Sequence, residues 1–115
     1  MKYIIYAENA QSFKDEIIFR VSNSEDRKGG SIDTWGIYNI NNDIVIEHTT
    51  GQWENKGCLI LKVNDDNNKI LVTFMYYDSC SDEDVSENDE GYILGRFSEL
   101  LLVHFQGEYH HVCFN

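Results

Sequence analysis

Seven carboxylates lie within thirteen positions of this chain, residues 78–90, and no cation separates them. The chain has 115 residues and a formal net charge of -11, so this acidic segment holds more than half of the excess charge. A field this local attracts cationic groups and repels nucleic acid. The chemistry that it predicts is the binding of a cation, either a metal ion or a basic protein surface. The carboxylates are Asp78, Asp82, Glu83, Asp84, Glu87, Asp89 and Glu90.

A calcium site is one interpretation of the acidic segment. Calcium loops need alternating oxygen ligands and a glycine at the sharp turn. Asp82 and Asp84 alternate correctly, but Glu87 stands where the glycine is required. In the second acidic run, residues 65–69, Lys69 occupies a ligand position. Two interpretations therefore remain open: a solvated surface loop over residues 78–90, or a loop that docks onto a basic protein.

Aromatic residues flank the acidic segment. Tyr77 precedes it, Tyr92 follows it, and Trp53 lies in an earlier segment that has the composition of a loop. Protein interfaces favour aromatic anchors surrounded by polar groups, although strands and cores also use such residues. The candidate partner-binding residues are therefore Asp82, Glu83, Asp84, Glu87, Asp89, Glu90, Tyr77, Tyr92 and Trp53.

His110, His111 and Cys113 form a second group with metal-binding chemistry. Adjacent residues on a strand point to opposite faces, and no second ligand pair has the spacing of a structural zinc site. The Gly29-Gly30 pair lacks the pattern of a phosphate-binding loop, and no cysteine lies in a nucleophile motif. We expect no cofactor, no metal and no enzymatic activity, and a small metal-binding domain stays as an alternative.

Composition and charge limit the class of protein. Hydrophobic residues make up 42% and aromatic residues 13%, which is typical of a folded chain, and the length predicts one domain over residues 1–115. The net charge of -11 argues against partners such as nucleic acid or an anionic membrane. Three cysteines without framework spacing, and no apolar signal segment, predict a cytoplasmic protein with reduced thiols.

The elements that must position these residues follow from the spacing of apolar side chains. Alternation and Asn/Asp-rich turns predict an α+β fold, an antiparallel β-meander of about five or six strands with one or two helices. Residues 9–23 fit either a helix or a strand: Phe13, Ile17 and Val21 recur every four residues, and Ser12 with Asp15 resembles a capping pair. The expected strands are residues 2–7, 35–40, 44–49, 58–63, 69–77 and 109–114.

Residues 95–106 carry the clearest helical pattern. Phe97, Leu101 and Phe105 lie on one face of such a helix, and Gly107 follows where a terminating glycine belongs. A hairpin from residue 100 to residue 114 is the alternative.

The character of the chain resembles the small acidic immunity proteins of bacterial contact-dependent growth inhibition, a polymorphic toxin system. The resemblance lies in the length, in the acidic stretch DSCSDEDVSENDE, and in the ending GRFSELLLVHFQGEYHHVCF. It implies tight binding to one cognate toxin, with a nuclease as the expected toxin, whose basic active-site groove the immunity protein covers. The alternative is a nucleic-acid mimic that inhibits a phage-defence nuclease, but a mimic needs carboxylates spread along one face, and here they are bunched.

Overall fold

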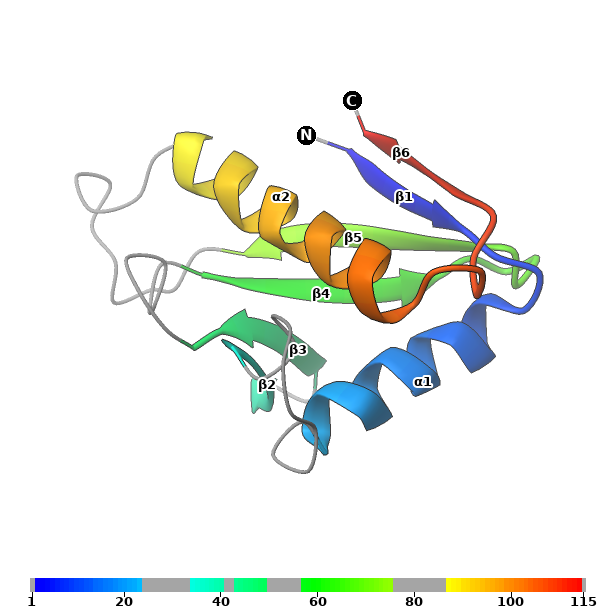
Figure 1. Cartoon of the computed structure of the whole chain (residues 1–115), viewed down its shortest axis with the longest axis horizontal. Coiled ribbons are helices and arrows are strands. Elements are labelled where there is room, and N and C mark those ends of the chain that lie inside the picture. The colour runs from blue at the N-terminus through cyan, green and yellow to red at the C-terminus, as the bar shows by residue number, and fades with distance from the viewer. Residues whose placement is uncertain (1, 24–33, 41–42, 50–56, 76–86, 115) are drawn as a thin grey trace.

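Alternating apolar residues form the strands of one antiparallel sheet, and two amphipathic segments form helices (Figure 1). The computed structural model describes residues 2–23, 34–40, 43–49, 57–75 and 87–114. Within these residues the elements are β1 (Tyr3–Tyr6), α1 (Ala10–Ser22), β2 (Trp35–Ile40), β3 (Asp43–His48), β4 (Cys58–Val63), β5 (Lys69–Met75), α2 (Glu87–His104) and β6 (His111–Phe114).

The six described strands pair in the order β2-β3-β4-β5-β1-β6, and every pairing is antiparallel. β2 to β5 follow one another along the chain, as the predicted meander requires. β1 lies between β5 and β6, where Tyr3 is opposite Val72 on one side and Phe114 on the other. The described part of the chain therefore confirms an α+β fold with six strands and two helices.

The ambiguous segment 9–23 forms a helix, α1. The side chain of Asn9 caps it, because its Oδ1 accepts a hydrogen bond of 3.0 Å from the backbone N–H of Ser12. The predicted capping pair of Ser12 and Asp15 is therefore wrong, and the cap lies three residues earlier. The predicted apolar face is confirmed, since the buried residues of the helix are Ala10, Phe13, Ile17 and Val21.

The second helix, α2, begins at Glu87, eight residues before the expected start at residue 95. It ends at His104, two residues before the expected end at residue 106. Ile93 and Leu94 extend the buried face toward the N-terminus, so the packing surface is longer than the predicted one. Gly107 follows the helix with a φ of 86°, the left-handed conformation expected of a terminating glycine. The hairpin alternative is wrong. The prediction of a loop over the whole acidic segment is also wrong, because residues 87–90 are helical.

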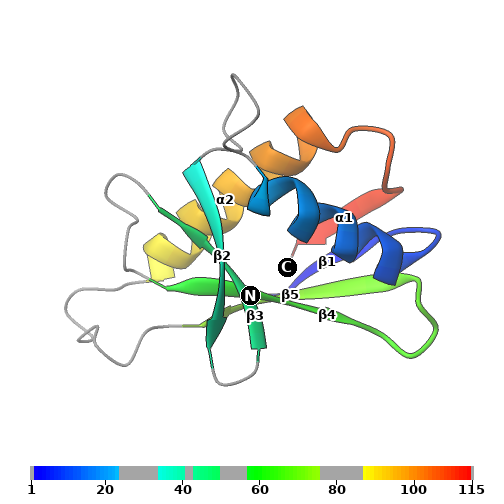
Figure 2. The ribbon, with the colours of Figure 1, turned by 90° about the horizontal axis from the view of Figure 1, so that it is seen from below.

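Both helices pack against one face of the sheet (Figure 2). Tyr3 and Ile5 of β1 point toward them and are buried in the common core. Ile4, between these two residues, pairs with Leu71 on the opposite face, where Leu71 is 42% exposed. The sheet therefore uses one face for the core, and β1 carries residues into the space beneath α2.

Candidate protein-binding surface

The acidic segment reaches the described structure at the start of α2. Glu87, Asp89 and Glu90 occupy the first four positions of this helix, and Tyr92 follows within the next turn. Among the other predicted binding residues, Trp53, Tyr77, Asp82, Glu83 and Asp84 lie outside the described residues. The structure therefore brings one end of the acidic segment together with one of the three predicted aromatic anchors.

The location of these carboxylates has a structural consequence as well. The first turn of a helix has unpaired N–H groups and a positive dipole end, so acidic residues there stabilise the helix by about 0.3–1 kcal/mol each. Glu87, Asp89 and Glu90 stand at these positions. The last three carboxylates of the acidic segment therefore belong to a regular helix.

The outer face of α2 carries large apolar side chains. Tyr92, Leu102 and Val103 are 60%, 61% and 58% exposed. Tyr92 and Val103 are eleven residues apart, about three helical turns, so they lie on the same side of the helix. Between them, Arg96 and Glu99 form an exposed ion pair of 3.3 Å. Singly exposed apolar residues are common on protein surfaces, and an aromatic residue such as Tyr92 is also of a type that interfaces favour.

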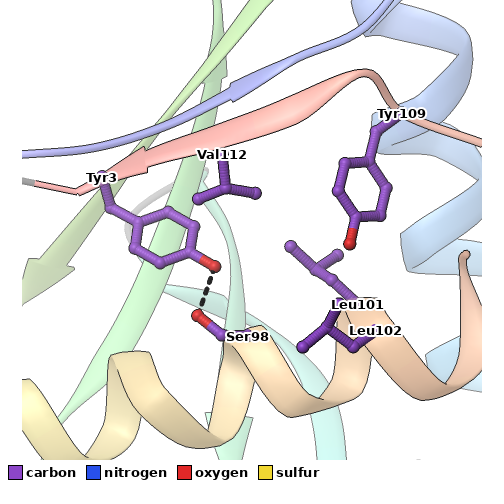
Figure 3. A pocket seen from close by; sticks show the side chains of 6 residues that line it. All are labelled: Tyr3, Ser98, Leu101, Leu102, Tyr109 and Val112. Atoms are coloured by element: carbon purple, nitrogen blue, oxygen red, sulfur yellow. Dashed lines mark hydrogen bonds between the residues drawn. The ribbon is translucent and has the colours of Figure 1, made fainter.

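A pocket of about 260 Å³ lies between α2 and the pair of strands β1 and β6 (Figure 3). Tyr3 and Ser98 meet at one wall, where the two hydroxyl oxygens are 2.6 Å apart. The Ser98 hydroxyl donates to the backbone carbonyl of Leu94, at 3.1 Å, so it accepts the proton of the Tyr3 hydroxyl. The lining residues are Tyr3, Ser98, Leu101, Leu102, Tyr109 and Val112.

The two phenols of this pocket stay protonated. Burial raises the pKa of Tyr3 above its usual value near 10, although its hydrogen bond with Ser98 acts in the opposite direction. The neighbouring Tyr109 also raises the pKa of Tyr3. Burial likewise raises the pKa of Tyr109. Both side chains are therefore neutral hydroxyl groups at physiological pH and take part in hydrogen bonding, not in acid–base chemistry.

Arg20 connects α1 to the turn that follows α2. Its guanidinium donates two hydrogen bonds to the Glu108 carboxylate, at 2.6 and 2.7 Å, and a third bond of 2.7 Å to the His104 carbonyl. Its Nε also pairs with Glu16 at 2.6 Å. Hydrogen bonding to Glu108 is the main reason that the pKa of Arg20 is raised further. These carboxylates are thus bound within the molecule and contribute little to attracting a partner.

In the predicted group of His110, His111 and Cys113, His111 takes part in packing. The His111 ring stacks on Tyr6 with the ring centres 4.3 Å apart. Within the described ranges, no three His, Cys, Asp or Glu side chains come close enough together to hold a metal ion. Cys58 is buried and Cys113 is half-buried.

No family model matches this chain, and no curated protein or solved structure does. None of the helices in the described residues is long and apolar enough to cross a membrane. The inference of function therefore depends on the residues and their geometry.

This pocket was not predicted by the sequence analysis. Its hydrogen-bonded pair, Tyr3 and Ser98, is separated by 95 residues, and Tyr109 comes from the turn before the last strand. The only local signal is the small polar Ser98 beside the apolar face of the helical pattern. The structure adds this pocket and the outer face of α2 to the predicted acidic segment.

Proposed function

We propose that this chain is an immunity protein, which binds and neutralises a cognate toxin by covering a basic active-site groove. A nuclease is the expected toxin, because a groove that binds nucleic acid is lined with cations. The observation that carries the proposal is the concentration of seven carboxylates in residues 78–90, the last of which begin α2. The exposed apolar side chains on the same helix support it.

The acidic segment and the outer face of α2 have different tasks in this proposal. Charge accelerates the encounter of the two proteins and orients them, but it adds less to the final affinity. Apolar anchors such as Tyr92 and Leu102 lose their hydration on contact and slow dissociation. Inhibition then needs no reaction, since occupying the groove excludes the substrate of the toxin.

The bunching of the carboxylates distinguishes this proposal from nucleic-acid mimicry. A mimic would repeat its charges along one face, at the spacing of phosphates. Here Glu16 and Glu108 pair with Arg20, and seven of the 20 acidic residues are concentrated in residues 78–90. One anionic end fits a single groove better than a long duplex-like track.

The test compares two variants with the same net charge. In the first, Asp82→Asn, Glu83→Gln, Asp84→Asn and Glu87→Gln neutralise the acidic segment. The control carries Asp15→Asn, Asp43→Asn, Asp65→Asn and Asp66→Asn, four exposed residues elsewhere. The binding partner is first captured from the native cell with the unmodified chain and then purified. Association rates are measured at low and high salt.

We expect the acidic-segment variant to associate about tenfold more slowly at low salt and to lose most of its salt dependence. The control variant should retain most of the rate, because its removed charges lie away from the contact. The unmodified chain should also restore growth to cells that express the captured partner. Equal rates for the two variants, or a partner that leaves growth unaffected, would refute the proposal.

A further inference from the structure

The pocket between α2 and β1–β6 has the size and lining of a binding site for one aromatic ring. An apolar cavity of about 150 Å³ accommodates benzene, and this one holds about 260 Å³. Leu101, Leu102 and Val112 supply apolar walls, and hydroxyl groups occupy the two ends (Figure 3). A larger ring with a small polar group therefore fits it better than a charged or flexible ligand.

The hydrogen bonds of the pocket determine which polar group the ring should carry. The Tyr3 proton goes to Ser98, and the Ser98 proton goes to the carbonyl of Leu94. Only lone pairs remain on these two oxygens, so this wall accepts hydrogen bonds and does not donate them. The Tyr109 hydroxyl, at the other end, points into the pocket and can rotate its proton (Figure 3). An indole, whose N–H is a donor only, complements such a wall.

The surroundings of the pocket indicate where the ring comes from. Leu102 lines the pocket and is 61% exposed, so the opening is part of the apolar outer face of α2. A free small molecule would leave that face in water, whereas a protein would cover it. Glu90 precedes Ser98 by eight residues on the same helix, an axial distance of about 12 Å. A basic segment of a partner can therefore reach the acidic start of α2 while an aromatic ring of the same segment occupies the pocket.

We propose that this pocket receives a tryptophan side chain that is flanked by cationic residues on the bound partner. This inference rests on the proposed function and specifies the contact by which the toxin is held. Tryptophan is enriched among residues that dominate interface energies, because a large ring is desolvated with little loss of rotamer freedom. The neighbouring cations supply the attraction to the start of α2.

The experiment uses NMR titration of the ¹⁵N-labelled full chain. The probes are indole, 1-methylindole, which lacks the donor, and two basic pentapeptides with blocked ends, KKWKK and KKAKK. Extended, each peptide spans about 17 Å. We expect saturable indole shifts at Ser98, Leu102 and Val112, and about threefold weaker binding of 1-methylindole. At low salt, KKWKK should bind about tenfold more tightly than indole, and KKAKK should not perturb the pocket.

Two variants make the assignment specific. Tyr3→Phe combined with Ser98→Ala removes both acceptors of this wall and keeps the apolar walls, so most of the preference for indole over 1-methylindole should disappear. Neutralising the start of α2 with Glu87→Gln, Asp89→Asn and Glu90→Gln should weaken KKWKK and leave indole binding unchanged, because indole carries no charge. The NMR spectrum of each variant without ligand shows whether that variant is folded.

Several results would overturn the inference. If indole shifts do not saturate, or map away from the pocket, the site does not bind aromatic rings. If KKWKK binds no more tightly than indole, the pocket serves a free small molecule and not a basic protein segment. Because the indole titration involves no captured partner, it can fail while the association test of the proposed function succeeds, and the reverse also holds.

Discussion

The two helices cover the same face of the sheet but present different surfaces to solvent. On α1, Arg20 is occupied by Glu16, by Glu108 and by the ring of Phe105, whose centre lies 4.7 Å from the guanidinium carbon. On α2, the outer face exposes Leu102 and Val103, and a pocket opens beside them. α1 uses its charges to bind the rest of the molecule, whereas α2 leaves apolar surface available.

Under the proposed function, this difference assigns stability to α1 and recognition to α2. Ion pairs that are satisfied internally have little left to offer a partner, while exposed apolar residues on a rigid element gain free energy when a partner covers them. Phe19 qualifies the contrast, since it is 59% exposed on α1. Phe19 belongs to α1, whereas the acidic residues Glu87, Asp89 and Glu90 belong to α2, and Phe19 does not line the pocket.

The largest expected effect distinguishes the buried face of α2 from its exposed face, by substitutions at two adjacent positions. Leu101 is 1% exposed and Leu102 is 61% exposed. Leu101→Asp buries a carboxylate in the core and should cost about 4 kcal/mol or more, a large share of the stability of a domain this size. Leu102→Asp, the matched control, should leave the thermal melting curve nearly unchanged. Circular dichroism melting of both variants checks this, and equal melting temperatures would show that the buried face is assigned incorrectly.

A smaller effect is expected where α1 is fastened. Arg20→Met keeps the apolar stem but removes the bonds to Glu108 and to the His104 carbonyl, and we expect a loss of about 2 kcal/mol in the free energy of unfolding. Arg96→Met breaks the exposed pair with Glu99, and we expect a cost of about 0.5 kcal/mol or less. Urea unfolding measures both values. If both variants lose a similar amount of unfolding free energy, the contacts of Arg20 stabilise the molecule no more than the exposed pair of Arg96 with Glu99 does.

The smallest effect concerns the outer side of α2. A methyl group added at Gly95 meets no atom within 4 Å, so Gly95→Ala should stabilise the chain by about 0.5–1 kcal/mol through helix propensity. The same change at Gly107, where φ is 86°, should destabilise the chain by about 1 kcal/mol. Urea unfolding measures whether each substitution raises or lowers the free energy of unfolding. If Gly95→Ala destabilises the free chain, this side of the helix is covered and unsuited to a partner.

Much of the fold follows from local patterns. Alternation located β2 to β5, and the four-residue spacing of Phe13, Ile17 and Val21 marked the buried face of α1. The start of α2 was missed because Glu87 and its neighbours provide no apolar periodicity, and only Ile93 and Leu94 hint at the longer helix. The position of β1 between β5 and β6 could not be predicted, since alternation identifies a strand without naming its neighbours.

The candidate site divides in the same way. The acidic segment is contiguous in the chain, so a count of charges finds it. The pocket depends on the pairing of β1 with β6, which places Tyr3 and Val112 on the same side of the sheet opposite Ser98. The link between Arg20 and Glu108 crosses 88 positions. Contacts of this kind appear only when the topology is known.

The place of β1 in the sheet also has a consequence for how the molecule is made. This strand is synthesised before its two neighbours, β5 and β6, which begin at Lys69 and His111. Until both have been synthesised, Tyr3 to Tyr6 form an apolar strand with two open edges. Closing such distant pairings is slow, so this strand stays prone to aggregation until its two neighbours have been made.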